Sequence, residues 1–203
     1  YRAYVILAML LIVILLIVPA YASEYDEAYN LYQQGKYDEA LPFINGYISG
    51  NERSSSAWNL KGLILMNLGS DQEALVAYNK AIELKPTSYI AYNNKGLAHK
   101  HLGQYQEALD AFNASLRISP TYINAYYNKG NLQMVMGRFS DAIVSLDSAL
   151  SYDPHYANAW YVKGLVYQKT DEHEKALESF SHTIEENPEH KEAWYYKGIS
   201  YTK

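Results

Sequence analysis

The chain has 203 residues, of which 49% are hydrophobic and 19% are charged, so it is too apolar for a disordered protein. It contains no cysteine, which excludes disulfides, thiolate metal sites and cysteine nucleophiles. The net charge of −5 offers no basic surface for phosphates, so we expect no nucleic-acid partner.

The N-terminal residues form an apolar segment. Residues 3–18 carry no charge, follow Arg2 and end at Pro19, and the A-x-A pattern of residues 20–22 comes next. This order is typical of a secretory signal peptide cleaved after Ala22. The alternative is an uncleaved hydrophobic helix that anchors the chain in a membrane through residues 3–22, since that length is about enough to span a bilayer. With Arg2 held inside, both alternatives predict that the rest of the chain is extracytoplasmic, either secreted or anchored with its repeats outside.

Beyond this segment the sequence repeats every 34 residues. We number the positions of each unit from Ser55, Tyr89, Ile123, Ala157 and Lys191. Position 8 is always glycine and follows a lysine, and position 4 is always Trp or Tyr. The columns are Gly62, Gly96, Gly130, Gly164 and Gly198 at position 8, and Trp58, Tyr92, Tyr126, Trp160 and Trp194 at position 4. Pro86, Pro120, Pro154 and Pro188 keep the same spacing.

Each unit predicts two helices. In residues 89–122 the first runs from about Tyr89 to Leu102 and stops at Gly103, and the second runs from about Tyr105 to Ile118 and stops before Pro120. In the unit 157–190, Asp171 replaces the glycine that ends the first helix. A glycine inside a helix is unfavourable, so its recurrence at position 8 predicts that two helix backbones approach closely there.

The pattern resembles the tetratricopeptide repeat. In residues 89–122 the matching residues are Tyr92, Gly96, His99, Ala108, Phe112, Ser115 and Pro120. The resemblance implies an all-α, right-handed superhelical solenoid of stacked helical hairpins whose first helices line a concave groove. It assigns residues 23–54 to a degenerate first repeat, 55–88, 89–122, 123–156 and 157–190 to full repeats, and 191–203 to the first helix of a truncated one.

The groove supplies the candidate site. Its residues are asparagines and tyrosines at positions 2, 5, 6 and 9, namely Asn59, Asn93, Asn94, Asn124, Tyr127, Asn128, Asn131, Asn158 and Tyr161. Asparagine amides match the donors and acceptors of a peptide backbone, so we expect the exposed side chains of Asn94 and Asn128 to hold an extended peptide. The alternative is that these asparagines contact no ligand. Positions 2, 5 and 6 lack Lys and Arg, which argues against the carboxylate clamp that some family members use.

No catalytic, cofactor or metal motif occurs in the sequence, so we expect neither an enzyme nor a cofactor. Lys100, His101, Lys169 and Lys203 lie near the groove and either favour an acidic partner or stabilise helix ends. The expected function is a scaffold that binds a protein or an extended peptide. The alternative is a structural repeat segment of a larger envelope assembly or multidomain enzyme. The aromatic residues of 191–203 lack a covering helix, so we expect either a continuation past Lys203 or docking on a partner or second copy.

Overall fold

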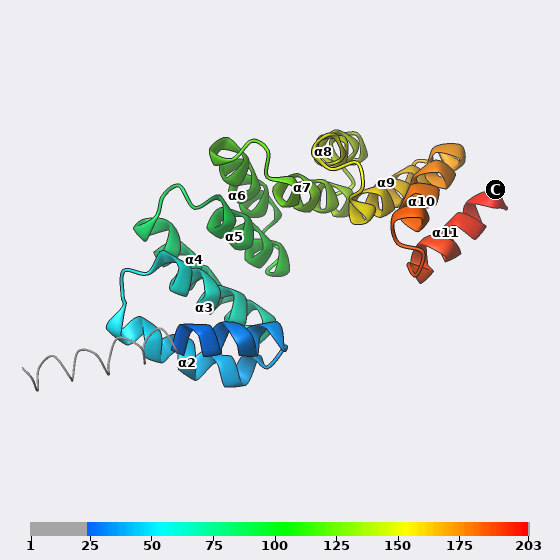
Figure 1. Ribbon diagram of the computed structural model, residues 1–203. Helices are drawn as coiled ribbons and strands as arrows, with labels where there is room; N and C mark the ends of the chain where they lie inside the picture. Colours follow the sequence, from blue (N-terminus) through cyan, green and yellow to red (C-terminus); the bar gives the residue numbers. More distant parts are fainter. Residues whose placement is uncertain (1–23, 203) are drawn as a thin grey trace, which may run out of the picture. The chain divides into compact units, whose positions relative to one another are not determined.

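The computed structural model of the protein describes residues 24–202, and every regular element in this range is helical (Figure 1). A helix over residues 24–33 is followed by α2 (Tyr37–Gly50), α3 (Ser55–Asn67), α4 (Asp71–Leu84), α5 (Tyr89–His101), α6 (Tyr105–Ile118), α7 (Ile123–Val135), α8 (Phe139–Tyr152), α9 (Ala157–Lys169), α10 (His173–Glu186) and α11 (Lys191–Tyr201). The predicted signal peptide or anchor lies outside the described residues. Among those described, no helix has the length and apolar character needed to span a bilayer.

The chain divides into two compact units between Leu102 and Gly103. Unit 1 contains the helix over residues 24–33 and α2 to α5, and unit 2 contains α6 to α11. In each unit a helix packs mainly on the helices next to it in sequence. The all-helical fold of stacked helical pairs is therefore as predicted, and the right-handed superhelix of the whole chain stays a prediction.

The turn inside each repeat requires a left-handed residue. After α7, Gly137 has a φ of 73°, and the N–H of Arg138 donates to the carbonyl oxygen of Gln133 at 2.8 Å. After α9, Asp171 takes the same place with a φ of 60°, and the N–H of Glu172 donates to the carbonyl oxygen of Tyr167 at 2.9 Å. The hydrogen bonds thus preserve the turn without glycine, at a conformational cost of about 1 kcal/mol.

The glycines at position 8 lie where the two helices of a repeat meet. A Cβ atom added to Gly62 would lie 2.4 Å from Cε1 of Tyr78, and one added to Gly164 would lie 2.5 Å from Cε1 of Phe180. At Gly130 the nearest atom is Cγ of Leu146, at 2.8 Å. The predicted close approach is therefore present, with one correction. The nearest atoms are those of a large side chain at position 24 of the second helix, not those of its backbone.

Tyr78 shows what position 24 requires. Its side chain is fully buried, and its hydroxyl has no hydrogen-bond partner among the described residues. Burial raises the pKa of this hydroxyl far above its usual range. The equivalent residues Phe112 and Phe180 are equally buried and carry no hydroxyl. The packing at this position therefore does not need the Tyr78 hydroxyl, which adds an uncompensated cost of desolvation.

The tryptophans at position 4 tie α3, α9 and α11 to the loop before each helix. The indole N–H donates to a backbone carbonyl six residues earlier: Trp58 to Glu52 at 2.9 Å, Trp160 to Pro154 at 2.8 Å and Trp194 to Pro188 at 3.0 Å. The lysine three residues later lies over each ring, with Nζ 4.9 Å from the ring centre in the pair of Lys163 and Trp160. In these three repeats the lysine and the tryptophan therefore stabilise each other as a cation–π pair.

The first helices of unit 2 form one continuous layer. α7 contacts α9, and α9 contacts α11, whereas α8 and α10 make no direct backbone contact within this described unit. On the inner side of a curved stack, helices lie closer together than on the outer side. The first helices of unit 2 therefore form its inner side. Side chains on the free face of α7, α9 and α11 therefore lie along one surface of unit 2.

The glycine contacts generate a matched pair of variants. Gly164→Ala should lower the free energy of unfolding by about 1–3 kcal/mol, because the added methyl group overlaps the buried ring of Phe180. Gly198→Ala should not lower it, because a Cβ there meets no atom within 4 Å and alanine favours a helix by about 1 kcal/mol. Urea unfolding followed by circular dichroism measures both. Equal effects of the two substitutions would show that position 8 does not control packing.

Candidate functional site

The predicted asparagines of unit 1 bond to one another. Nδ2 of Asn94 donates to Oδ1 of Asn59 at 3.1 Å, and Nδ2 of Asn93 donates to Oδ1 of Asn94 at 3.3 Å. The side chains of Asn93 and Asn94 are only 3% and 7% exposed. The expectation that Asn94 is exposed and free to hold a peptide is therefore wrong.

The reason is the place of position 6 between neighbouring first helices. α3 contacts α5 directly, and the residues equivalent to Asn94 in the repeats that begin at Ser55 and Ala157 are Leu60 and Val162. Both are buried, with exposures of 3% and 4%. The apolar residues at position 6 indicate that this position is buried. Comparing position 6 across the repeats is therefore enough to predict the burial of Asn94.

In unit 2 the predicted site residues occupy the free face of α7 and α9. Asn124 and Asn158, both at position 2, are exposed, while Asn128 and Asn131 are half-buried. Tyr127, at position 5, packs edge-on against Tyr156, with ring centres 5.2 Å apart. The structure thus brings the α7 residues and the start of α9 together.

The Tyr156 hydroxyl lies between the two exposed asparagines. It donates to Oδ1 of Asn124 at 3.5 Å and also hydrogen-bonds with Asn158. Burial is the main reason that the pKa of Tyr156 is raised to about 12, with Tyr127 as the next cause. Burial also raises the pKa of Tyr127, and its hydrogen bond with Asn131 opposes that rise. Both hydroxyls therefore stay protonated, as hydrogen-bond donors, at neutral pH.

Tyr161 continues the same surface toward α11. Its ring centre lies 4.5 Å from that of His190 and 6.3 Å from that of Tyr196. Burial raises the pKa of Tyr161, and Tyr196, Glu192 and Tyr127 raise it further. Tyr195 packs on Tyr196 with ring centres 5.2 Å apart and is 66% exposed. We name this set the tyrosine row: Tyr127, Tyr156, Tyr161, Tyr195 and Tyr196.

Three members of the row, Tyr156, Tyr195 and Tyr196, are not among the predicted site residues. Tyr195 occupies position 5, as Tyr127 and Tyr161 do, and this column holds Asn59 and Asn93 in the earlier repeats. The column therefore contains the signal that identifies Tyr195. Tyr156 precedes α9 as its N-cap residue, outside the helical positions on which the prediction rests. A comparison of the repeats that includes the residue before each first helix would identify Tyr156.

Few charges lie beside the tyrosine row. Positions 2, 5 and 6 of the first helices contain no Lys or Arg, and Glu192 at the start of α11 is exposed. Of the cations predicted near the groove, His101 pairs through Nδ1 with Oδ1 of Asp71 at 3.0 Å in unit 1. Burial lowers the pKa of Lys100, also in unit 1. Lys169 is exposed at the end of α9, and Lys203 lies outside the described residues. Within residues 24–202 no group of three His, Asp or Glu side chains converges to hold a metal ion.

Sequence comparison decides the family. A tetratricopeptide repeat profile matches residues 89–122 and 123–156, and a second one matches residues 157–190. A TPR repeat profile matches residues 62–103, so the matches together span more than half of the chain. The chain belongs to the tetratricopeptide repeat family. A search of curated proteins found no match.

Solved structures, among them two of TPR proteins, have the same fold. TTC0263 from Thermus thermophilus superposes with a TM-score of 0.77 at 18% identity, covering 91% of this chain and 100% of its own. PilW, a type IV pilus biogenesis factor, gives 0.78 at 19% identity, with 90% and 89% covered. YrrB, a TPR protein with an unusual peptide-binding site, gives 0.66 at 21% identity, with 86% and 90% covered. At these identities the likeness concerns the fold alone.

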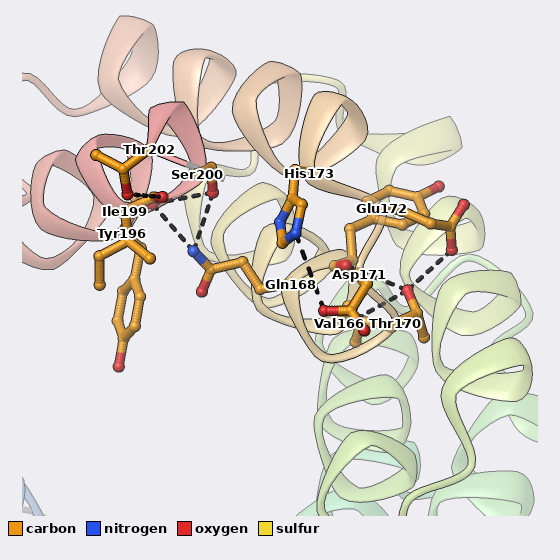
Figure 2. Close-up of polar contacts among 11 residues, drawn as sticks. Val166, Gln168, Thr170, Asp171, Glu172, His173, Tyr196, Ile199, Ser200 and Thr202 are labelled. Carbon is orange, nitrogen blue, oxygen red and sulfur yellow. Dashed lines mark hydrogen bonds and ion pairs between the residues drawn. The ribbon is translucent and has the colours of Figure 1, made fainter.

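The last described tetratricopeptide repeat helix leaves a second surface open, on α10 and α11. Nε2 of Gln168 on α9 donates to the carbonyl oxygen of Tyr196 at 3.0 Å and to Oγ of Ser200 at 2.9 Å, which fixes α11 against α9 (Figure 2). Beside this contact, Ser200, Leu177 and the 171–175 turn line a pocket of about 480 Å³. Nδ1 of His173, which lines it, is buried without a hydrogen-bond partner among the described residues.

This pocket has a smaller counterpart one repeat earlier. There Phe139, Ile143 and Val166 replace His173, Leu177 and Ser200, and the volume is about 290 Å³. Thr170 and Glu172 of the following repeat close its outer side. No described residue takes that place beside α11, where Trp194 and Tyr201 are 54% and 70% exposed. The larger pocket thus lies beside side chains of α11 that no described residue covers.

The asparagine contacts predict a structural role for Asn94. Asn94→Ala should lower the free energy of unfolding by about 1–2 kcal/mol, because it removes hydrogen bonds to Asn59 and Asn93 at a buried position. Asn30→Ala is the control, since Asn30 is an exposed helical residue, and it should leave stability unchanged within about 0.5 kcal/mol. Urea unfolding compares the two. A neutral Asn94→Ala would restore the view of Asn94 as a residue reserved for ligand.

Proposed function

We propose that the chain is a non-catalytic scaffold that binds an extended segment of a partner protein on the free face of α7, α9 and α11. The observation that carries this proposal is the tyrosine row, flanked by the exposed amides of Asn124 and Asn158. Ring contacts connect these three helices, from Tyr127 to Tyr156 and from Tyr161 to Tyr196. A folded partner domain would need a broader apolar patch, whereas an extended segment needs only a narrow row of such groups.

The family membership supports the same function. Stacked helical repeats present extended inner surfaces for proteins and peptides, and YrrB is a structural neighbour with a peptide-binding site. Asn124, Tyr127, Asn128, Asn131, Asn158 and Tyr161 are the site residues in this proposal. Asn59, Asn93 and Asn94 are excluded from it because they are engaged with one another in unit 1.

We also propose that the repeats function outside the cytoplasm. The support is the sequence of residues 1–22, with Arg2 before the apolar run and an A-x-A pattern after it. An extracytoplasmic partner, or a partner segment exposed at the membrane surface, follows from this location. Whether the segment is cleaved or retained decides between a secreted and an anchored scaffold.

A second candidate function is a structural segment of a larger envelope assembly or multidomain enzyme. The exposed surface of α10 and α11 favours it, because Trp194 and Tyr201 would be covered by packing against another domain. The two functions use different surfaces, since neither residue belongs to the tyrosine row. They are therefore compatible in one protein.

Peptide selection tests the binding proposal. Peptides selected from a random library on the full chain should bind at least tenfold more weakly to the double variant Asn158→Ala and Tyr195→Ala, a loss of about 1.4 kcal/mol. Val76→Ser is the matched control, because Val76 is 64% exposed on α4, a second helix, and its loss should not affect affinity. Selection of no peptide, or equal binding by both variants, would contradict the proposal.

A fusion experiment tests the location. A reporter enzyme that is active only outside the cytoplasm, fused after residue 203, should be active with the whole chain and inactive when residues 3–22 are deleted. An N-terminus at Ser23 in a soluble fraction would identify a signal peptide, and an intact N-terminus in the membrane fraction would identify an anchor. An inactive reporter on the whole chain would overturn the extracytoplasmic location.

A further inference from the structure

One side of α11 carries an uncovered apolar stripe. Trp194, Gly198 and Tyr201 occupy positions 4, 8 and 11, which lie on the same side of the helix. All three are exposed, with Trp194 at 54% and Tyr201 at 70%. A Cβ atom added to Gly198 would meet no atom within 4 Å. Among the described residues, nothing occupies the space above this glycine.

The same stripe is covered on α9. There the residues at positions 4, 8 and 11 are again Trp, Gly and Tyr, and α10 packs against them. Gly164 is buried beneath the ring of Phe180, and Trp160 and Tyr167 are half-buried. Because the two helices have identical residues at these three positions, α11 presents the surface with which α9 binds a second helix.

The second helices show what binds to such a stripe. Each presents three fully buried residues on one side, at i, i+4 and i+7. The first is always alanine, the second is a large apolar or aromatic residue, and the third is a small one. In order, these residues are Ala74, Tyr78 and Ala81 on α4, Ala108, Phe112 and Ser115 on α6, Ala142, Leu146 and Ala149 on α8, and Ala176, Phe180 and Thr183 on α10. A helix with this pattern is therefore the matching partner for the stripe of α11.

Charge restricts the first turn of such a helix. In the smaller pocket, one repeat earlier, the first turn of α10 contributes Lys175 to the lining. The equivalent place beside α11 is the pocket of about 480 Å³, whose lining includes Asp171, Glu172 and Glu174. Lys175 lines this pocket too, but its ammonium group is already paired with Glu172. The remaining carboxylates favour a Lys or Arg in the first turn of the incoming helix.

From these features we propose that α11 binds an amphipathic helix of a partner protein, which completes a hairpin with α11 as α10 does with α9. The large apolar residue of the partner helix fills the space above Gly198. The bonds from Gln168 to Tyr196 and Ser200 already hold α11 against α9, so the stripe is formed before the partner arrives (Figure 2). This inference names the partner that the second candidate function requires, and it uses a different surface from the tyrosine row.

The test uses a copy of α10 as the partner helix. The probe is a fluorescent peptide of residues 172–187, in which Glu174→Lys allows a lactam bridge to Glu178 that keeps the short peptide helical. Both bridged positions are exposed on α10, so the bridge leaves the packing side free. Fluorescence anisotropy should show binding of this peptide to the full chain. Phe180→Ala in the peptide should weaken the binding at least about tenfold, because the large apolar residue is lost.

Two substitutions on α11 form a matched pair. Gly198→Leu should weaken binding at least about tenfold, because its side chain fills the space that the peptide requires. Glu192→Leu adds the same side chain at position 2 and should leave binding unchanged. Position 2 is exposed on α3, α7 and α9, although a second helix packs on each of them. Circular dichroism verifies that both variants keep the helical content of the parent.

Each outcome decides the inference. Binding that is lost with Gly198→Leu and with the Phe180→Ala peptide, but kept with Glu192→Leu, supports it. Absence of binding by the bridged peptide, or equal binding by all variants, overturns it. Self-association of the chain without peptide that Gly198→Leu abolishes, measured by analytical ultracentrifugation, would instead assign the stripe to a second copy.

The two binding surfaces can fail separately. Peptides selected on the tyrosine row should bind the Gly198→Leu variant as they bind the parent, because Gly198 does not belong to the row. Failure of the bridged helix to bind therefore excludes this partner for the second candidate function and leaves the binding of an extended segment standing. Loss of both kinds of binding with Gly198→Leu would overturn the assignment to a separate surface.

Discussion

The fold depends on the fit between a glycine in the first helix of a repeat and a large side chain in the second helix. Within a repeat, the absent Cβ of Gly62, Gly130 or Gly164 leaves room for the side chain at position 24 of the second helix. That side chain, Tyr78, Leu146 or Phe180, is fully buried. Because this contact sets how closely the two helices approach, it also determines where the first helix of the next hairpin can pack. The helical hairpin is thus the unit that the rest of the structure repeats.

The same contact determines which positions of the first helix are buried and which stay accessible. One stripe is used inside the hairpin and against the next one, which removes positions 6 and 8 from solvent, as Leu60 and Val162 show. Position 5 is buried at Asn93 in unit 1, whereas in unit 2 it is half-buried or exposed. In unit 1 the residues at position 5 take part in an amide network, and in unit 2 they are tyrosines, of which Tyr127 and Tyr195 pack edge-on against another ring. Identical backbone architecture therefore supports two surfaces of different chemistry.

Much of this could be predicted because the 34-residue columns report on packing directly. The helix ends of α5 and α6 lie within one residue of the prediction, since glycine and proline punctuate the sequence there. The prediction for Asn94 was wrong because a helical wheel describes one helix, whereas the burial of Asn94 comes from the neighbouring hairpin. The contribution of Tyr156 was missed because it comes from a residue before the helix. Contacts between repeats, unlike those within one, require the stacked structure or a comparison of every column.

Packing between sequence neighbours also has a consequence for cooperativity. In unit 2 the helices far apart in sequence, such as α7 and α11, do not contact one another, so the described part of the fold links them only through α9. A stack of this kind behaves as a chain of nearest-neighbour couplings, in which one end can open while the other stays closed. A ligand that lies across α7, α9 and α11 would add a direct link between the ends. Binding would then couple the unfolding of α11 to that of α7, because a ligand that recognises only the closed stack stabilises that state by mass action.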